Sequence, residues 1–465
     1  MDLPGEEQRR WVESFGWGPI TSSRRQGRWR PQWFLQVRDS EGGERALLLR
    51  SARDPEQVAG SHLLSHFSIE REARVLESLQ DTSLRVPRYF GFHAPSQSIL
   101  MEVVEGDADF SGLVDPRERE SIADDYVDQL IELHGLDVRA RVGDLDPMPT
   151  TPEQTATANK FRFAELDYEQ GGADRRPDPL LEYGRWWLHR NLPAGERPAC
   201  LLQGDTGPGQ FLFARGHVTA LIDWEMAHVG DPMLDLGVMR MREVLYPTGL
   251  VPRMLQRYGD RAHHGVDRGA LHYYTVMSML LSPLAMAASL ERPSGLQPTI
   301  IQRFAWDVIL RRGLCEALLE AVGGALTPPD LARLPGEVPM LPRLLGELLD
   351  GYADRARSEH ERYEMRSASQ LAEVVSRSSA IAPELEAADC RDIQAATGRT
   401  CEDREQGMRL LSEIVAAAPD RVGETLLGAL YRIQRRREHL FEPILREQAH
   451  APLEWMDPPG SGERA

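Results

Sequence analysis

The sequence of 465 residues predicts an α+β fold in two lobes, followed by an all-helical C-terminal extension. Short apolar runs typical of strands dominate residues 1–105, whereas apolar residues at helical spacing dominate residues 106–326. A proline-rich stretch, 327–342, separates these parts from residues 343–456, whose pattern is almost entirely helical. We therefore expect a β-rich lobe, a mainly helical lobe, a linker and a helical extension, with residues 457–465 as a disordered tail.

The composition is that of a globular protein and argues against several classes of partner. Hydrophobic residues make up 41% of the chain and charged residues 27%, which is typical of a protein with a sizeable buried core. The formal net charge of −18 disfavours nucleic acid and an anionic membrane as partners. An anionic substrate would therefore have to be met by a local basic cluster.

Three further features bear on location and composition. The four cysteines form no CxxC pair, and the polar N-terminus has no signal-peptide region, so we expect a cytoplasmic protein with reduced thiols. The apolar run 273–290 is short for a membrane span and is interrupted by Pro283, which favours a buried core helix. Lys160 is the only lysine, and this excess of arginine indicates genome composition.

The N-terminal lobe is predicted element by element from its apolar pattern. Residues 1–30 should hold the first strand and its loop. Residues Trp33–Val37 and Ala46–Leu49 predict two paired strands joined by a turn over Asp39–Glu44. A charged helix with an apolar face follows around residues 64–79, and Ile99–Val104 predicts another strand.

The second lobe is predicted from helical spacing and stop signals. Tyr126, Leu130 and Leu133 lie three or four residues apart, and the helix they predict ends at His134 and Gly135. Residues 180–192 predict an aromatic-rich helix, and residues 236–245 predict another. The extension repeats this helical rhythm and carries no group of residues with evident chemistry.

The stretch 201–235, LLQGDTGPGQFLFARGHVTALIDWEMAHVGDPMLD, carries the chemistry. Its two alternating runs predict a β-hairpin that ends at Asp223 and Glu225, and Gln210 follows Asp205 by five residues. Carboxylates and an amide at this spacing could hold a divalent metal and a reacting hydroxyl. The alternative is that Asp205 and Asp223 are ordinary turn residues. An aspartic protease is disfavoured because no second copy of the Asp-Thr-Gly motif exists.

This stretch resembles the catalytic segment of the aminoglycoside phosphotransferase-like, protein-kinase-like small-molecule kinases, in the branch associated with acyl-CoA dehydrogenases. That branch reads roughly His-Gly-Asp-Thr-Gly-Pro-Gly-Asn, then a hairpin, Leu-Asp-Trp-Glu, and Gly-Asp-Pro followed by Asp. The matching residues are Gly204, Asp205, Thr206, Gly207, Pro208, Gly209, Asp223, Trp224, Glu225, Gly230, Asp231, Pro232 and Asp235.

The resemblance implies a bilobal protein-kinase-like fold and a kinase that uses ATP and Mg²⁺ to phosphorylate an alcohol group of a small molecule. The branch points to a hydroxyacyl-type substrate. Asp205 would be the catalytic residue, and Asp223 and Gln210 would be the metal ligands. The site would be supported structurally by Gln203, Glu225 and Asp235.

The resemblance also implies how the nucleotide is held. Arg50, paired with Glu72, would hold the phosphates, and the backbone around Glu102 and Val104 would contact the adenine. The chain lacks a regular glycine-rich loop, so Ser22 and Ser23 with the neighbouring arginines are candidate phosphate contacts. The alternatives are a solvated basic loop and a surface glutamate on a charged helix.

The chain departs from the family pattern at Gln203, where the family has His, and at Gln210, where it has Asn. Two functions therefore follow. The first is an active phosphotransferase that binds a nucleotide and a small-molecule substrate. The second is a catalytically impaired pseudokinase that acts as a nucleotide-binding or protein-interaction module. In either case the helical extension could bind a second copy of the chain or another protein, or simply pack.

Overall fold

The computed structural model describes residues 3–27, 30–53, 55–143, 145, 149, 151, 154, 160–170, 178–291, 300–332, 340–356, 359–446 and 451–456. Its internal contacts divide the chain into two compact units. Unit 1 comprises Met1–Asp167, Pro193–Arg242 and Thr248–Asp267, and unit 2 comprises Tyr168–Leu192, Glu243–Pro247 and Arg268–Ala465. Unit 1 contains both the N-terminal sheet and the catalytic segment.

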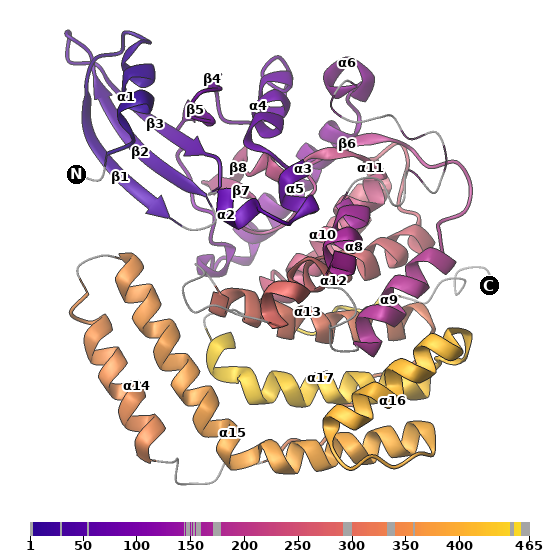
Figure 1. The fold of residues 1–465 in the computed structure, drawn as a ribbon. Helices are drawn as coiled ribbons and strands as arrows, with labels where there is room; N and C mark the ends of the chain where they lie inside the picture. The colour runs from indigo at the N-terminus through magenta and orange to yellow at the C-terminus, as the bar shows by residue number, and fades with distance from the viewer. Residues whose placement is uncertain are drawn as a thin grey trace. The chain divides into compact units, whose positions relative to one another are not determined.

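Unit 1 begins with a five-stranded sheet of order β1-β2-β3-β5-β4, in which each neighbouring pair is antiparallel (Figure 1). The strands are β1 Ile20–Gly27, β2 Pro31–Arg38, β3 Glu44–Ser51, β4 Tyr89–His93 and β5 Ser98–Glu102. The predicted pairing of the second and third strands is confirmed, with Leu35 opposite Leu47. Both side chains are buried, as alternation requires when one sheet face covers a core.

A helix that the sequence reading did not anticipate precedes the sheet. Helix α1 spans Glu6–Glu13 within the region where we expected only the first strand and its loop. Val12 is buried, and it belongs to the same apolar cluster as Leu35 and Leu49. The apolar side of α1 therefore covers part of the sheet, which a search for strands alone could not reveal.

Helix α4, Ile69–Ser78, brings a charged residue into the core of unit 1. Its N-cap is Ser68, whose side-chain oxygen accepts a hydrogen bond from the Arg71 amide. Ile69, Val75 and Leu76 are buried, and so is Glu72. The other short helices before the long second-lobe helix are α2 Pro55–Val58 and α3 His62–His66.

The rest of unit 1 consists of helices around two small antiparallel pairs, β6 with β9 and β7 with β8. The predicted hairpin is confirmed as β7 and β8, and the predicted helix ending at His134 is confirmed as α5. The elements are η1 Phe110–Gly112, α5 Pro116–His134, α6 Val138–Val142, β6 Cys200–Leu202, β7 Phe211–Ala214, β8 His217–Leu221, η2 Trp224–Met226, β9 His228–Gly230, α10 Pro232–Leu245 and α11 Val251–Arg261. Helix α10 continues for three residues into unit 2.

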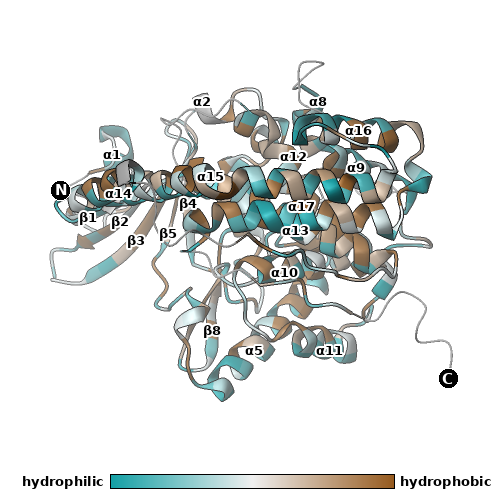
Figure 2. Ribbon diagram, turned by 90° about the horizontal axis from the view of Figure 1, so that it is seen from below, coloured by the Kyte–Doolittle hydropathy of each residue, from teal (hydrophilic) through white to brown (hydrophobic). Residues whose placement is uncertain are grey.

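Among its described residues, unit 2 contains helices joined by loops and no strand. Its elements are the end of α8 Lys160–Gln170, then α9 Pro179–Arg190, α12 Arg268–Glu291, α13 Ile300–Ala321, α14 Met340–Ala353, α15 Glu359–Thr397, α16 Arg404–Ala417, η3 Pro419–Arg421 and α17 Glu424–Leu445. Figure 2 shows hydrophobic and hydrophilic residues together along α15 and α17, as expected for helices that bury one face. Helix α13 packs against both α12 and α17.

Helix α12 carries the apolar run of the sequence. By length and composition alone it could cross a membrane, but 61% of its most apolar window is buried within the protein. Tyr274, Val276 and Leu280 are almost completely covered. The prediction of a core helix agrees with this burial.

The predicted domain boundaries remain predictions. Helix α14 begins at Met340, inside the predicted linker, while residues 333–339 and the predicted tail 457–465 lie outside the described residues. The proposed role of 343–456 in binding a partner likewise remains a prediction.

Candidate active site

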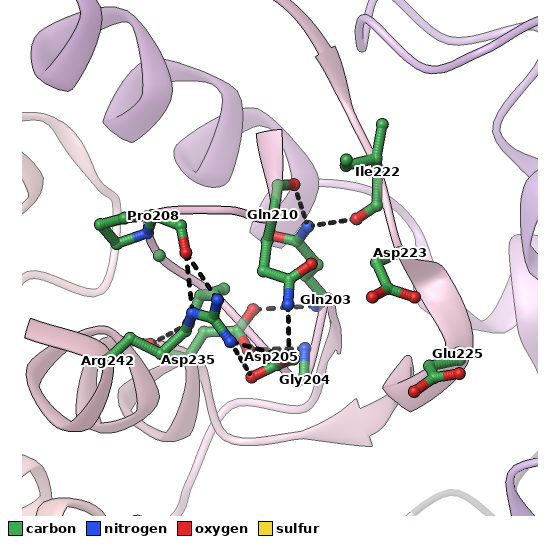
Figure 3. A network of polar contacts seen from close by, with 12 residues as sticks. Gln203, Gly204, Asp205, Pro208, Gln210, Ile222, Asp223, Glu225, Asp235 and Arg242 are labelled. Carbon is green, nitrogen blue, oxygen red and sulfur yellow. Dashed lines mark hydrogen bonds and ion pairs between the residues drawn. The ribbon is translucent and has the colours of Figure 1, made fainter. Parts of the chain in front are cut away.

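The candidate site lies entirely within unit 1, where the loop after β6 meets the end of β8 (Figure 3). Asp205 lies in the loop, whereas Asp223 directly precedes the short helix η2. Asp223 has φ = 61° and ψ = 57°, a left-handed conformation that Asp tolerates better than most residues. Non-glycine residues held in this region cost free energy and cluster at functional sites.

Two side chains hold the Asp205 carboxylate. Gln210 Nε2 donates a hydrogen bond of 2.6 Å to Asp205 Oδ2, and Arg242 Nη1 donates to both carboxylate oxygens at 3.1 Å. Arg242 also donates to the Pro208 carbonyl, at 2.6 Å from Nη2. The sequence prediction that Gln210 and Asp205 lie together is therefore matched by the structure, and the carboxylate is held in one orientation.

Gln210 has one oxygen that is buried and unused. The residue is 6% exposed, and its Oε1 has no hydrogen-bond partner among the described residues. In Figure 3 this oxygen is turned to the side on which Asp223 lies. Leaving a buried acceptor unsatisfied costs about 1–3 kcal/mol, so its retention calls for an explanation.

A divalent cation bound at this oxygen would satisfy it. Amide and carboxylate oxygens are the ligands that Mg²⁺ takes, usually together with water and substrate phosphates rather than in an all-protein cage. No cluster of three or more His, Cys, Asp or Glu residues suited to a metal occurs in the described part of the chain. Asp223 and Gln210 nevertheless suit a Mg²⁺ site that is completed by water and substrate phosphates. They are the two residues that the resemblance implied as metal ligands.

Gln203 and Asp235 brace the loop, as the resemblance implied. Gln203 Nε2 donates to the carbonyls of Gln210 at 3.0 Å and Ile222 at 2.9 Å, which joins the two arms of the site. Asp235 accepts hydrogen bonds of 2.9 Å from the backbone amides of Gln203 and Gly204. His134 contacts Asp235 from α5, with 3.0 Å between Nε2 and Oδ2. The side chains of Gln203, Asp235 and His134 are all buried.

Arg50 at the end of β3 joins the sheet to the catalytic segment. Its Nη1 lies 3.3 Å from Glu72 Oε1, so the expected pair forms. Its Nη2 also donates to Asp223 at 2.6 Å and to Glu225 at 3.0 Å, contacts that we did not predict. The guanidinium thus contacts Glu72 of α4 and both carboxylates that follow strand β8.

The electrostatics of this cluster follow from burial and from three arginines. Burial raises the pKa of Asp223, although Arg50 opposes this shift. Burial also acts to raise the pKa of Glu225, but Arg53, Arg50 and Arg30 outweigh it and hold that pKa at about 2. Glu225 is therefore a firmly ionised anchor for cations.

Sequence reasoning missed four cations of the site: Arg30, Arg53, Arg242 and Lys160. Arg30 lies 2.7 Å and Arg53 2.8 Å from Glu225. The arginine-rich composition masks such residues, since no single arginine stands out. Arg242 had a usable signal, because it follows Asp235 by seven residues and so shares one face of α10.

The other residues predicted to contact the nucleotide lie on strands β1 and β5 and just after β5. Ser22 and Ser23 lie within strand β1, opposite Gln36 and Leu35, rather than in the loop after it. Residues 28 and 29 of that loop lie outside the described part of the chain. Glu102 ends β5, and Val104 makes no backbone hydrogen bond to another described residue, so its amide and carbonyl are free for a ligand.

Comparison with known proteins agrees with this site. The family model described as "Phosphotransferase enzyme family" matches residues 25–274, more than half of the chain. A crystal structure assigned as an aminoglycoside phosphotransferase from Ralstonia eutropha shares the fold with a TM-score of 0.51. It is 19% identical in sequence and is matched over 66% of this chain and 95% of its own.

Two curated relatives match the sequence itself. "Acyl-CoA dehydrogenase family member 11" of Rattus norvegicus is 29% identical over 228 residues, which are 46% of this chain and 27% of the relative. "Acyl-CoA dehydrogenase family member 10" of Mus musculus is 28% identical over 227 residues, which are 45% of this chain and 19% of the relative. The chain thus matches about a quarter or less of the length of these relatives.

Proposed function

Because the chain belongs to the phosphotransferase enzyme family, we propose that it transfers the γ-phosphoryl group of ATP, bound with Mg²⁺, to a hydroxyl group of a small molecule. The observation that carries this proposal is the pairing of Asp205 with Gln210, whose buried Oε1 is left without a partner on the side of Asp223. An unused oxygen between two carboxylates suits a cation that arrives with the nucleotide.

Asp205 would act on the acceptor hydroxyl. The hydroxyl oxygen forms a bond to the γ-phosphorus, the bond from that phosphorus to the β–γ bridging oxygen breaks, and ADP leaves. The hydroxyl proton passes to the Asp205 carboxylate. Arg242 and Gln210 keep the carboxylate oriented for this contact. A bound Mg²⁺ would neutralise charge on the phosphates.

Arg50 and its partners would hold the nucleotide. Glu72 is buried and positions one side of the guanidinium. On nucleotide binding, the other side would exchange Asp223 for phosphate oxygens, which frees Asp223 for the metal. The free backbone groups of Val104 suit an adenine base.

The cations near Asp205 support a neutral or anionic acceptor. Arg242 contacts the catalytic carboxylate directly, and Lys160 contacts the preceding residue. A polycationic acceptor such as an aminoglycoside would meet like charges at the reacting hydroxyl. This is consistent with a hydroxyacyl-type substrate, which carries an acid or thioester group instead.

Thermal melting with ATP and Mg²⁺, given separately and together, tests the proposal. A ligand at about 100 times its dissociation constant stabilises the folded state by about 2.7 kcal/mol, which is easily seen. We expect a shift that needs both ligands and that disappears in Asp223→Ala. Asp128→Ala, a surface residue of α5 paired with Arg257, is the matched control and should respond like the wild type.

The second candidate function is a pseudokinase, and one observation favours it. Arg50 donates to an oxygen of Asp223 at 2.6 Å, so a metal ion would have to compete with the guanidinium for this carboxylate. If no combination of ATP and Mg²⁺ stabilises the wild type, the pseudokinase proposal replaces the proposal of an active kinase. We propose a cytoplasmic location for the protein whether it is an active kinase or a pseudokinase.

A further inference from the structure

Lys160 is the only lysine of the chain, which has 54 lysines and arginines together. A composition bias that places arginine at 53 positions shows that guanidinium serves almost everywhere a cation is needed. A single lysine in such a chain raises the question of whether ammonium has a role there that guanidinium cannot fill. Ammonium is a compact point charge with three donors, whereas guanidinium is a larger planar fork.

The structure places this lysine at the catalytic loop. Lys160 is the first residue of α8 and is 5% exposed. Its Nζ donates a hydrogen bond to the carbonyl of Gly204, which immediately precedes Asp205. Gly204 is its one hydrogen-bond partner among the residues that the structure describes. A cation from a distant segment thus holds the peptide that leads into the catalytic residue.

The Gly204 peptide has little room to move. Gly204 has φ = +81°, and a Cβ there would lie 2.1 Å from the Met226 carbonyl oxygen. Its amide donates to Asp235 on one side, and its carbonyl accepts from Lys160 on the other. Opposite charges therefore clamp the two ends of this residue. An arginine at position 160 would place a larger, planar guanidinium in this buried contact.

Burial lowers the pKa of Lys160, and Arg242 adds to this lowering, while the carboxylates of Asp205, Asp235 and Glu225 act in the opposite direction and favour the ammonium form. Three carboxylates and one guanidinium thus act on the amine. A charged partner strengthens the hydrogen bond to Gly204 relative to a neutral one.

We propose that Lys160 is a positioning residue for phosphoryl transfer: its ammonium fixes the Gly204 carbonyl and so sets the direction of the Asp205 carboxylate. The inference rests on the proposed role of Asp205. Displacing a catalytic group by about 1 Å can cost about 10²-fold in rate. Removing the ammonium should therefore lower the turnover of the protein and leave its affinity for the nucleotide unchanged.

A single lysine allows a direct test without any acceptor substrate. Labelling with ¹⁵N-lysine gives one side-chain Nζ signal, which needs no assignment. We expect a slowly exchanging ammonium signal in the wild type that shifts in Asp205→Asn and again when Mg²⁺ and a non-hydrolysable ATP analogue are added. A fast-exchanging signal, unmoved by Asp205→Asn, would overturn the proposal.

The second experiment measures the kinetics of ATP turnover in variants of Lys160. Lys160→Met keeps an unbranched side chain that is one atom shorter and removes the charge, so we expect kcat to fall at least tenfold with the KM for ATP within twofold. Lys160→Arg should lose turnover as well, because it places a larger, planar guanidinium in the buried contact. Arg162→Met, on the same helix and about half exposed, is the matched control and should retain wild-type values.

The NMR and kinetic experiments together distinguish failure of the positioning role from failure of the proposed function. A Lys160→Met variant with wild-type kcat, or a Lys160→Arg variant that restores it fully, contradicts the positioning role. A wild type that binds no ATP with Mg²⁺ refutes the proposed function instead, and the response of the Nζ signal to Asp205→Asn then decides whether Lys160 holds the loop. If Lys160→Met does not fold, that same signal in the wild type decides.

Discussion

At the scale of single residues, the site is defined by which polar atoms are satisfied and which are left free. Gln203, Asp205 and Asp235 have their hydrogen-bonding groups occupied by neighbours within the loop. Gln210 uses its nitrogen and leaves its oxygen unpaired among the described residues. This imbalance distinguishes a site prepared for a ligand from a loop that is simply well packed.

Gln210→Leu should separate stability from function. The change removes a buried unsatisfied oxygen, which costs about 1–3 kcal/mol in the wild type, and also the hydrogen bond from Nε2 to Asp205, which contributes about 1.5–3 kcal/mol. Because these two effects are opposite and similar in size, we expect the melting temperature without ligands to change little. The additional stabilisation by Mg²⁺ with ATP should be lost.

The control is Gln256→Leu in the exposed part of α11, which should keep the ligand response. A large fall in the ligand-free melting temperature of Gln210→Leu would mean that its oxygen has a partner in solution. Retention of the Mg²⁺ response would show that Gln210 is not a ligand.

The residue scale also shows where the sequence was informative. The spacing of Asp205, Gln210 and Asp223 predicts their grouping because a hairpin of known length connects them. The cations were not predictable in this way. Arg30 and Lys160 come from segments far away along the chain, and no local pattern records which distant segment a folded loop will meet.

At the scale of elements, helix α4 is decisive because it carries Glu72 to Arg50. Its first turn is closed by Ser68, whose side chain accepts the Arg71 amide at 3.2 Å. Ser68→Ala should destabilise unit 1 by about 1 kcal/mol, the usual cost of losing an N-cap. Thermal melting measures the change.

Ser121→Ala is the matched control for the N-cap, since Ser121 is exposed inside α5. Alanine is the better helix former there, so this variant should be neutral or slightly more stable. Equal melting temperatures for Ser68→Ala and the wild type would show that α4 does not depend on this cap.

A buried carboxylate in unit 2 makes a prediction about pH. Burial acts to raise the pKa of Asp307, but Arg311 at 2.7 Å and Arg437 at 2.9 Å outweigh it and hold the pKa below its usual value. A lowered pKa in the folded state contributes stability above the unfolded value of about 3.9, and this contribution is lost as the pH falls through the folded pKa.

Asp307→Asn should therefore be less stable than the wild type at pH 7, by roughly 3 kcal/mol, because it leaves buried guanidiniums without their partner. The difference should shrink as the pH falls below about 4. Urea unfolding across this pH range measures it. A difference that is constant with pH would contradict the assigned shift.

The elements themselves were predicted more reliably than their partners. The β2–β3 pair, the β7–β8 hairpin and α5 lie where the apolar spacing indicated. Helix α1 was missed because its eight residues contain few apolar positions, so local pattern gives a weak signal. Its place is fixed by packing of Val12 with sheet residues, a tertiary effect.

At the scale of the whole molecule, an acidic chain concentrates cations at one site. The net charge is −18, yet Arg30, Arg50 and Arg53 gather at Glu225, and Arg242 and Lys160 lie at the catalytic loop. The composition predicts that an anionic ligand needs such a cluster. In unit 1 the cluster coincides with the residues proposed for nucleotide and metal.

The coupling between Mg²⁺ and ADP binding tests the central claim most directly. Calorimetric titration of ADP, in Mg²⁺ and in EDTA, gives two dissociation constants whose ratio is the coupling. We predict that Mg²⁺ tightens ADP binding at least tenfold in the wild type. In Asp223→Asn, which preserves shape and tolerates the left-handed backbone, the ratio should fall to about one. Equal affinities in Mg²⁺ and EDTA, or full coupling in Asp223→Asn, would contradict a metal–nucleotide site at Asp223.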